Sequence, residues 1–303
     1  MTLPSNDEDF KGKVVVLTGA SRGIGKAIAD ALIANGAYVV IGDLLEKEGQ
    51  AVVDAYNNEA KSKVAAFIRT DVTIYKDNQD LFKLAESEFG GVDHAVLNAG
   101  IALNANSYFS EMNDDLEEKI IDVNTTAVIK GTKVALLHMA KRGGGSIVHV
   151  ASVAGFIASP SLASYNASKH GVIGYTRSFT LMPYVCNVRV NALCPFYVDT
   201  DLVNTKYKNE TKADTAQRTL IHTFELTPMS VVVEGALQLM ADATKNTEAV
   251  LCLPEGNIPM DRPALPASFT TKDKIESLKQ HYAEVTIPLA KSALNGALER
   301  YGI

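Results

Sequence analysis

The amino-acid sequence alternates between short apolar runs and longer segments with helical periodicity. Residues 13–18 form an apolar run rich in β-branched side chains, and a glycine-rich turn and a helical pattern over 24–34 follow it. A second apolar run over 37–42 ends at Asp43. Because such runs are typical of strands buried on both faces of a parallel sheet, this segment predicts a strand, a turn, a helix and a second strand.

The alternation continues to about residue 195 and determines the expected fold class. Further strands are predicted over 63–68, 94–97, 146–150 and 188–193, and further helices over 46–60, 75–89, 114–141 (one long helix or two in succession) and 161–182. Strands that alternate with helices predict an α/β fold built on one doubly wound parallel sheet.

Two later segments depart from this pattern. Residues 199–227 are polar and mixed, which predicts a short helix pair or a mobile substrate flap. Residues 254–270 contain four prolines and predict an irregular connection to a helical tail over 272–301, interrupted near Pro288. We therefore expect a leader over 1–10, a main domain over 11–255 and a C-terminal extension over 256–303. The tail is expected to pack on the body, on a second subunit or over a substrate mouth.

The composition argues against several classes of protein, including nucleic-acid-binding and metal-binding proteins. A net charge of -6 argues against a nucleic-acid-binding surface. The three cysteines and six histidines lack the spacing of a metal site, so no metal is expected, and the low cysteine count is compatible with a reducing compartment. We see no secretory signal and no apolar run long enough to span a bilayer, which favours a cytoplasmic protein.

The glycine-rich turn predicts a dinucleotide cofactor. Gly19, Gly23 and Gly25 lie between a predicted strand and a predicted helix, where glycines let the backbone approach a pyrophosphate. Asp43 ends the second strand, where a carboxylate accepts hydrogen bonds from an adenosine ribose and repels a 2′-phosphate, and this favours NAD over NADP. Arg22 favours the opposite choice, because a guanidinium pairs with phosphate. A structural turn and a strand-ending aspartate are the alternatives.

Several other polar residues follow the ends of predicted strands. Asp71 and Val72 are expected to contact an adenine ring, although Asp71 is equally suited to capping the next helix. The segment 98–100, Ser152 and Pro195 follow three further strands. Ligands of open α/β sheets bind beyond the carboxyl ends of the strands, so this convergence predicts a cofactor cleft.

The most informative pair in the chain is Tyr165 and Lys169. Their spacing of four residues places them on one face of the predicted helix over 161–182. A cation beside a phenol favours the phenolate, so we expect Lys169 to lower the pKa of Tyr165 and to make Tyr165 an acid/base. Ser152 is a candidate for binding the same substrate oxygen, and Asn124 a candidate for holding a water that connects Lys169 to solvent. The alternatives are a turn serine and an exposed or capping asparagine.

Taken together, the segments 18–25, 71–72 and 98–100 with Asn124, Ser152 and Tyr165-x-x-x-Lys169 resemble the short-chain dehydrogenase/reductase family over about residues 11–253. The segments 167–178 and 188–195 are most similar to NAD-dependent hydroxyprostaglandin dehydrogenase-like members. The resemblance implies a Rossmann-type domain and four catalytic residues, Asn124, Ser152, Tyr165 and Lys169. It implies cofactor contacts by Gly19, Ser21, Arg22, Gly23, Ile24, Gly25, Asp43, Asp71, Val72, Asn98, Ala99, Gly100, Tyr165, Lys169, Pro195, Val198 and Thr200.

The chain departs from the family pattern after Pro195, where Phe196 occupies the position of the usual glycine. Phe196 and the next residue, Tyr197, predict an apolar wall, so the expected substrate residues are Ser152, Tyr165 and Phe196. The resemblance implies an NAD-dependent oxidation of a secondary alcohol on a fairly apolar, lipid-, steroid- or terpenoid-like substrate. The alternatives are an NADPH-dependent ketone reductase and a non-redox isomerase, cyclase or NAD-binding protein. Family members form homodimers or homotetramers, and we expect the same here.

Overall fold

The computed structural model describes residues 10–102, 112–160, 162–204, 212–264 and 266–303. The leader predicted over 1–10 lies outside these residues except for Phe10. The ring of Phe10 is buried, with its centroid 5.7 Å from that of His94. Phe10 therefore belongs to the packed body.

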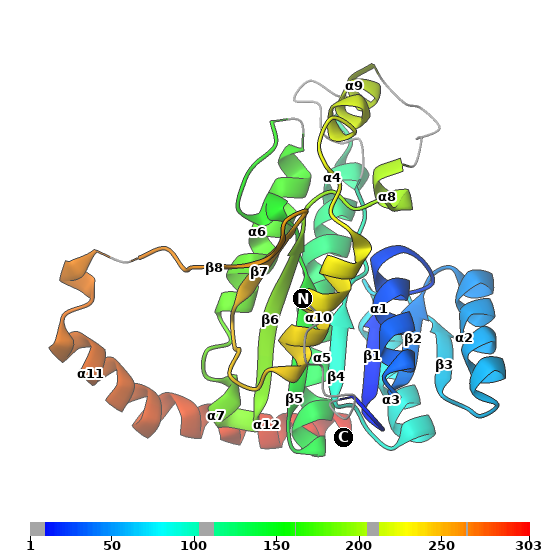
Figure 1. Cartoon of the computed structure of the whole chain (residues 1–303). Helices are drawn as coiled ribbons and strands as arrows, with labels where there is room; N and C mark the ends of the chain where they lie inside the picture. The colour runs from blue at the N-terminus through cyan, green and yellow to red at the C-terminus, as the bar shows by residue number, and fades with distance from the viewer. Residues whose placement is uncertain (1–9, 103–111, 161, 205–211, 265) are drawn as a thin grey trace.

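Eight strands form one sheet in the order β3-β2-β1-β4-β5-β6-β7-β8, seen in Figure 1. The strands β1 to β7 run parallel, and β8 pairs antiparallel with β7. They are β1 (Val14–Thr18), β2 (Tyr38–Asp43), β3 (Ala65–Arg69), β4 (His94–Leu97), β5 (Gly145–Val150), β6 (Val188–Pro195), β7 (Ala249–Leu253) and β8 (Gly256–Met260).

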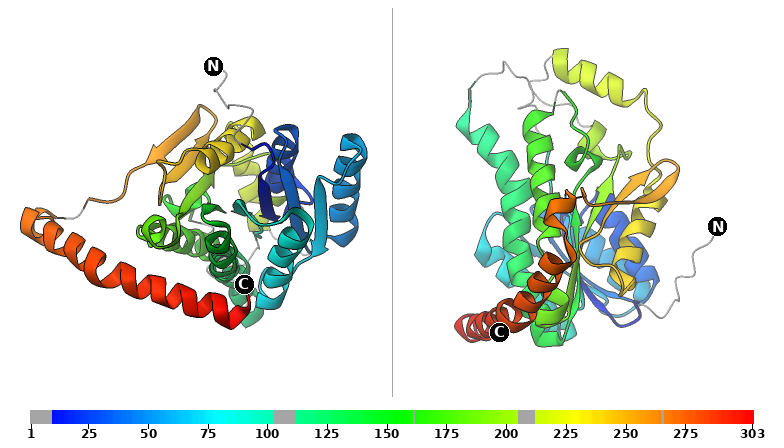
Figure 2. Two further views of the ribbon diagram at one scale, coloured as in Figure 1. Left: turned by 90° about the horizontal axis from the view of Figure 1, so that it is seen from below. Right: turned by 90° about the vertical axis from the view of Figure 1, so that its left-hand side faces the viewer.

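Helices cover both faces of this sheet (Figure 2). The α-helices are α1 (Gly23–Ala34), α2 (Glu46–Ala60), α3 (Tyr75–Phe89), α4 (Asp114–Ile121), α5 (Ala127–Arg142), α6 (Ala163–Arg177), α7 (Met182–Cys186), α8 (Asp201–Asn204), α9 (Lys212–Ile221), α10 (Met229–Ala241), α11 (Lys272–His281) and α12 (Ile287–Tyr301). Short 3-10 helices are η2 (Val153–Gly155) and η3 (Ala267–Phe269), and π-helical segments are η1 (Asp122–Thr126) and η4 (Tyr282–Thr286).

Each face of the sheet has its own apolar core. On one face, Ile28 of α1 and Leu239 of α10 pack with Leu17 of β1. On the other face, Phe82 of α3 and Val172 of α6 belong to the second core. The predicted doubly wound sheet with helices on both faces is confirmed.

The strand register places the carboxyl ends of the central strands at one level. Thr18 of β1 lies opposite Gly42 of β2 on one side and opposite Leu97 of β4 on the other. The chain leaves β1 toward one face and β4 toward the other, so a crevice is expected between their ends. This is the edge at which the predicted cofactor residues emerge.

The segment 254–270 is less irregular than its prolines predicted. Residues 256–260 form β8, and Pro259 lies opposite Val250 of β7. Proline removes one ladder hydrogen bond but is tolerated on an edge strand, and β8 is the outermost strand of the sheet. The prediction was wrong here because a proline count does not show whether a strand lies at an edge.

The helical tail is confirmed, but the interruption predicted near Pro288 is not found, because η4 joins α11 directly to α12 and Pro288 lies in the first turn of α12, where proline is tolerated. The two helices of the tail pack differently. Helix α12 packs against α7 and α5 beneath the body, whereas α11 extends away from the body (Figures 1 and 2). The tail lies away from the carboxyl edge of the sheet. No helix in the described part of the chain has the length and apolar character required to cross a membrane.

Candidate active site

The turn between β1 and α1 exposes backbone rather than side chains. Gly19 and Gly23 have φ angles of 65° and 60°, which glycine adopts without strain. A Cβ atom at Gly19 would lie 2.8 Å from the Cα atom of Ala99, and one at Gly25 would lie 2.5 Å from the Gly19 carbonyl oxygen. The N-cap side chain of α1 makes no capping hydrogen bond. The first N–H groups of α1, including that of Ile24, are therefore suited to binding a pyrophosphate.

Asp43 connects β2 to this turn. Its Oδ2 atom accepts a hydrogen bond from Ser21 N, and its Oδ1 atom accepts one from Leu45 N, both at 3.0 Å. The Ser21 hydroxyl is buried and has no hydrogen-bond partner among the described residues. A buried hydroxyl without a partner is costly, so Ser21 Oγ fits a cradle that receives a polar ligand group.

Arg22 is directed toward the loop after β6. Its Nη1 atom donates to Asp201 Oδ2 of α8 at 2.9 Å, and both side chains are 61% exposed. An exposed ion pair of this kind contributes about 0–1 kcal/mol. Thr200, next to Asp201, lies near Gly23, since a Cβ atom at Gly23 would lie 3.7 Å from Thr200 Cγ2. The glycine turn and the loop after β6 therefore face each other.

Asp71 forms a local turn at the end of β3. Its Oδ1 atom accepts hydrogen bonds from Thr73 N at 3.0 Å and from Thr73 Oγ1 at 2.6 Å. The N-cap of α3 is Ile74, so Asp71 does not cap that helix, which was the alternative to an adenine contact. Val72 follows with its side chain buried.

The segment 98–100, which follows β4, is hydrogen-bonded to the end of β1 and the glycine turn. Asn98 Nδ2 donates to the carbonyl oxygens of Thr18 at 3.1 Å and Gly19 at 2.7 Å. The Thr18 hydroxyl in turn accepts hydrogen bonds from the backbone of Asn98 at 3.1 Å and Ala99 at 3.2 Å. The Asn98 side chain thus holds the glycine turn in place, and Gly100 lies beside Asn124 and Lys169.

Tyr165 and Lys169 lie one turn apart on α6. Lys169 is 4% exposed, and its Nζ atom lies 5.6 Å from the centroid of the Tyr165 ring. Burial raises the pKa of Tyr165 to about 12, although hydrogen bonding to Ser152 lowers it. The expected lowering of this pKa by Lys169 is not found. Lys169 Nζ donates instead to the Val150 carbonyl at 3.1 Å, and burial lowers the pKa of Lys169 to about 8.

Asn124 lies in the π-helical segment η1, a geometry often found at functional sites. Its Oδ1 atom accepts from Ile101 N at 2.8 Å, and its Nδ2 atom donates to Ile101 O at 2.9 Å and to Ser168 Oγ at 3.2 Å. A Cβ atom at Gly100 would lie 3.3 Å from Asn124 Oδ1 and 3.6 Å from Lys169 Nζ. Asn124 and Lys169 thus approach the same point of the chain. The water held by Asn124 stays a prediction.

A cavity of about 530 Å³ opens beside these residues. Ser152, Tyr165 and Lys169 line it on one side, together with Pro195, Val198 and Thr200 from the loop after β6. Much of the remaining wall is apolar, including Ile157, Leu162, Phe196, Tyr197, Ile221 and Phe224. The volume falls in the range of about 300–1,000 Å³ that is usual for small-molecule sites.

The aromatic part of this wall is larger than the sequence predicted. Phe196 and Tyr197 lie with ring centroids 4.5 Å apart, and Phe224 meets them at 5.6 Å and 5.9 Å. The predicted apolar wall thus includes a third ring, Phe224, from the segment 199–227 that was predicted as a substrate flap. Helix α9 also lines the cavity, through Asp214, Gln217 and Arg218. Residues 205–211 of the predicted flap lie outside the described part of the chain.

Comparison with known proteins agrees with this geometry. Residues 13–211 match the short chain dehydrogenase family. The NAD(+)-linked 15-hydroxyprostaglandin dehydrogenase of Homo sapiens is 31% identical over 245 residues, which cover 78% of this chain and 88% of that protein. Cis-4-hydroxycyclohexanecarboxylate dehydrogenase of Sinomonas cyclohexanicum is 39% identical over 199 residues, covering 65% of this chain and 77% of that protein.

A solved structure shows the same fold. The crystal structure of levodione reductase superimposes with a TM-score of 0.73 at 23% identity, over 81% of this chain and 97% of that one. These matches cover most of the chain, and they agree with the glycine turn and the Tyr165–Lys169 pair. The chain therefore belongs to the short-chain dehydrogenase family and is an oxidoreductase.

Proposed function

We propose that this protein oxidises a secondary alcohol of a fairly apolar substrate to a ketone, with NAD as the hydride acceptor. The observation that carries the proposal is the meeting of Ser152 and Tyr165 with an apolar cavity of about 530 Å³, directly beside the glycine turn. A lipid-, steroid- or terpenoid-like alcohol matches the aromatic wall. The dehydrogenase names of the relatives support this class of reaction.

The glycine turn supports a dinucleotide, and Asp43 supports NAD. The uncapped N-terminus of α1 and the unpartnered hydroxyl of Ser21 would hold the phosphates or the adjoining ribose. The Asp43 carboxylate would accept from the ribose and repel a 2′-phosphate. Arg22, the residue that favours NADP, is paired with Asp201. The similarity to an NAD(+)-linked dehydrogenase points the same way.

Three side chains of the protein carry the chemistry of the alcohol. Ser152 and Tyr165 orient the substrate oxygen, and Tyr165 removes the hydroxyl proton as the carbon loses a hydride. A bound nicotinamide supplies the hydride acceptor. Lys169, whose Nζ atom lies 5.6 Å from the centroid of the Tyr165 ring, would bind the nicotinamide ribose. Orientation of the alcohol between these groups supplies a further part of the rate.

The reverse reaction, reduction of a ketone with NADPH, uses the same residues. In that direction Tyr165 donates its proton, and its pKa of about 12 keeps it protonated at neutral pH. This observation favours reduction, whereas Asp43 opposes NADPH. The two functions therefore differ in a measurable way, the cofactor that the protein binds more tightly.

The experiment uses the purified full chain with NAD or NADP and a panel of secondary alcohols of increasing apolar size. We expect reduced nicotinamide to form with NAD and the larger apolar alcohols, as followed by its absorbance. The Asp43→Asn variant is expected to lose much of the preference for NAD over NADP. Tighter binding of NADP by the unmodified protein would overturn the choice of cofactor, and no turnover with any alcohol would overturn the proposed reaction.

A further inference from the structure

Two side chains that do not line the 530 Å³ cavity donate hydrogen bonds to the loop between β3 and α3. Its residues, 71–74, are those expected to contact the adenine ring. Asn78 Nδ2 of α3 donates to the carbonyl oxygens of Val72 and Ile74, both at 2.8 Å. Lys130 Nζ of α5 donates to the carbonyl oxygen between them, that of Thr73. Three consecutive carbonyl groups of the loop therefore receive a side-chain donor.

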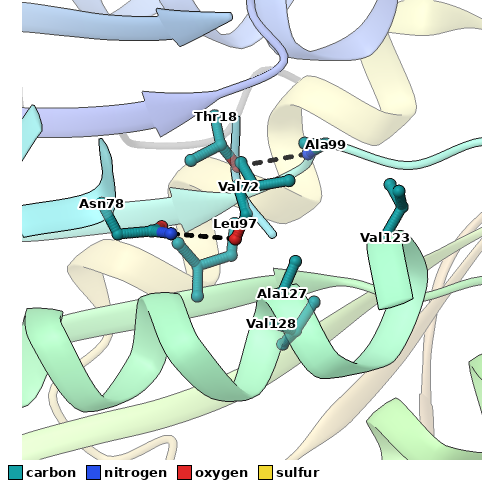
Figure 3. Close-up of a pocket in the computed structure, with 8 residues that line it drawn as sticks. All are labelled: Thr18, Val72, Asn78, Leu97, Ala99, Val123, Ala127 and Val128. Carbon is teal, nitrogen blue, oxygen red and sulfur yellow. Dashed lines mark hydrogen bonds between the residues drawn. The ribbon is translucent and has the colours of Figure 1, made fainter. Parts of the chain in front are cut away.

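The Asn78 side chain is buried and bonds to the loop instead of to solvent. It is 1% exposed, and Figure 3 shows its amide directed at the Val72 carbonyl beside a small void of about 10 Å³. Leu97 and Val128 line the same void. A buried amide is costly unless it is hydrogen-bonded. Nδ2 of Asn78 is satisfied by the two loop carbonyls, whereas its Oδ1 atom has no partner among the described residues, so the bonds to the loop are the specific contacts of this side chain.

Lys130 approaches the loop from a different element. Its ammonium group lies 5.5 Å from the centroid of the Tyr75 ring, at the start of α3, while it donates to Thr73. A cation over an aromatic face is favourable, so this contact fixes the direction of the Lys130 side chain. Side chains from two different helices, α3 and α5, therefore donate hydrogen bonds to the same loop.

The loop follows the carboxyl end of β3, the edge at which the cofactor residues are expected. The Asp71 carbonyl accepts from Ile74 N at 3.0 Å. Because the intervening peptide is trans, the Val72 N–H points away from that bond. Among the described residues, neither Val72 N nor Asp71 Oδ2 has a hydrogen-bond partner. An adenine edge offers the matching pair, a ring nitrogen and an exocyclic amine.

We propose that Asn78 and Lys130, here called the loop anchors, are positioning residues for the adenine half of the dinucleotide. They hold residues 71–74 so that Val72 N and the Asp71 carboxylate meet the ring. This inference rests on the proposed function, since it requires a dinucleotide at the carboxyl edge. It predicts that the two halves of the cofactor respond differently when an anchor is removed.

The test measures binding of ADP and of nicotinamide mononucleotide separately by calorimetry, using the full chain. We expect Asn78→Leu to weaken ADP about tenfold, because two hydrogen bonds to the loop are lost, and to leave the mononucleotide within about twofold. Lys130→Met is expected to weaken ADP less, by about threefold. In turnover, KM for NAD should rise while kcat is retained.

Asn57→Leu is the matched control. Asn57 fixes the opposite end of β3, where its Oδ1 atom accepts from Val64 N at 2.8 Å and Ala65 N at 2.9 Å. This variant should lower the melting temperature without selective loss of ADP. Unchanged ADP affinity in both anchor variants, or equal losses for ADP and the mononucleotide, would overturn the inference alone. No ADP binding by the unmodified protein would overturn it together with the proposed function.

Discussion

The two halves of the carboxyl edge are built by different means. In the half that we propose binds the cofactor, called the cofactor half below, Asn98 hydrogen-bonds to Gly19 and Asp43 to Ser21. In the substrate half, aromatic rings such as Phe196 pack beside a cavity. A fixed frame of hydrogen bonds suits a ligand that does not vary, whereas side chains on loops suit a substrate of variable shape.

Tyr165 belongs to both halves, so its replacement has the largest expected effect. Tyr165→Phe removes the proton acceptor and should lower kcat by about 10²–10⁴-fold while NAD binding stays nearly intact. Steady-state kinetics and titration with NADH measure the two quantities. Tyr197→Phe is the control, because Tyr197 lines the same cavity and keeps its ring. Activity retained by Tyr165→Phe would remove the residue from the mechanism.

The pH dependence tests the same residue without changing the sequence. Only the phenolate of Tyr165 accepts a proton, and burial raises its pKa to about 12. Oxidation should therefore rise by about tenfold per pH unit below the controlling pKa, or about 100-fold from pH 6 to pH 8. Ketone reduction needs the phenol and should not rise with pH.

The Ser152→Ala variant tests the same pH dependence more specifically. Its hydrogen bond lowers the pKa of Tyr165, so Ser152→Ala should shift the rising limb of oxidation to higher pH. Ser159→Ala, in the wall of the same cavity, should leave the limb in place. A limb that is flat between pH 6 and pH 8 in the unmodified protein would contradict the role of Tyr165 as the titrating base.

The glycine turn tests the cofactor half by itself. At Gly25 an added Cβ would lie 2.5 Å from the Gly19 carbonyl, so Gly25→Ala should displace the turn. Overpacking costs about 1–3 kcal/mol, and we expect NADH affinity to fall by about 5- to 150-fold. Gly174→Ala adds a methyl group in a helix where no atom lies within 4 Å, and it should be neutral or stabilising. Equal NADH affinity in both variants would show that the turn does not contact the cofactor.

The sequence predicted the strands and helices around the glycine turn well because their signals are local. The predicted bounds of α2, α3 and β4 agree with the structure at both ends. Gly19 and Asp43 were identified because a positive φ angle or a strand end requires particular residue types at particular positions. Their convergence follows from the parallel register of β1, β2 and β4.

Features that depend on distant contacts were not predictable in the same way. Phe224 joins the wall only because residues 196 and 224 meet in space. Asn78 looks like an ordinary helix residue until its two carbonyl partners are known. The pKa of Tyr165 was expected to fall, since spacing shows that Lys169 is near but does not show how deeply the phenol is buried.

Phe196 tests the substrate half with the smallest expected effect. Phe196→Ala removes one ring of the aromatic wall, so KM for a large apolar alcohol should rise by about tenfold, as loss of part of a buried aromatic contact implies. KM for NAD and the turnover of a small secondary alcohol should change little. Phe89→Ala is the control, because Phe89 stacks on Tyr38 with a centroid distance of 4.8 Å outside the cavity wall. If Phe196→Ala raised KM for NAD as much as KM for the alcohol, the two halves would not be separable, and the contrast between a fixed cofactor frame and an adaptable substrate wall would fail.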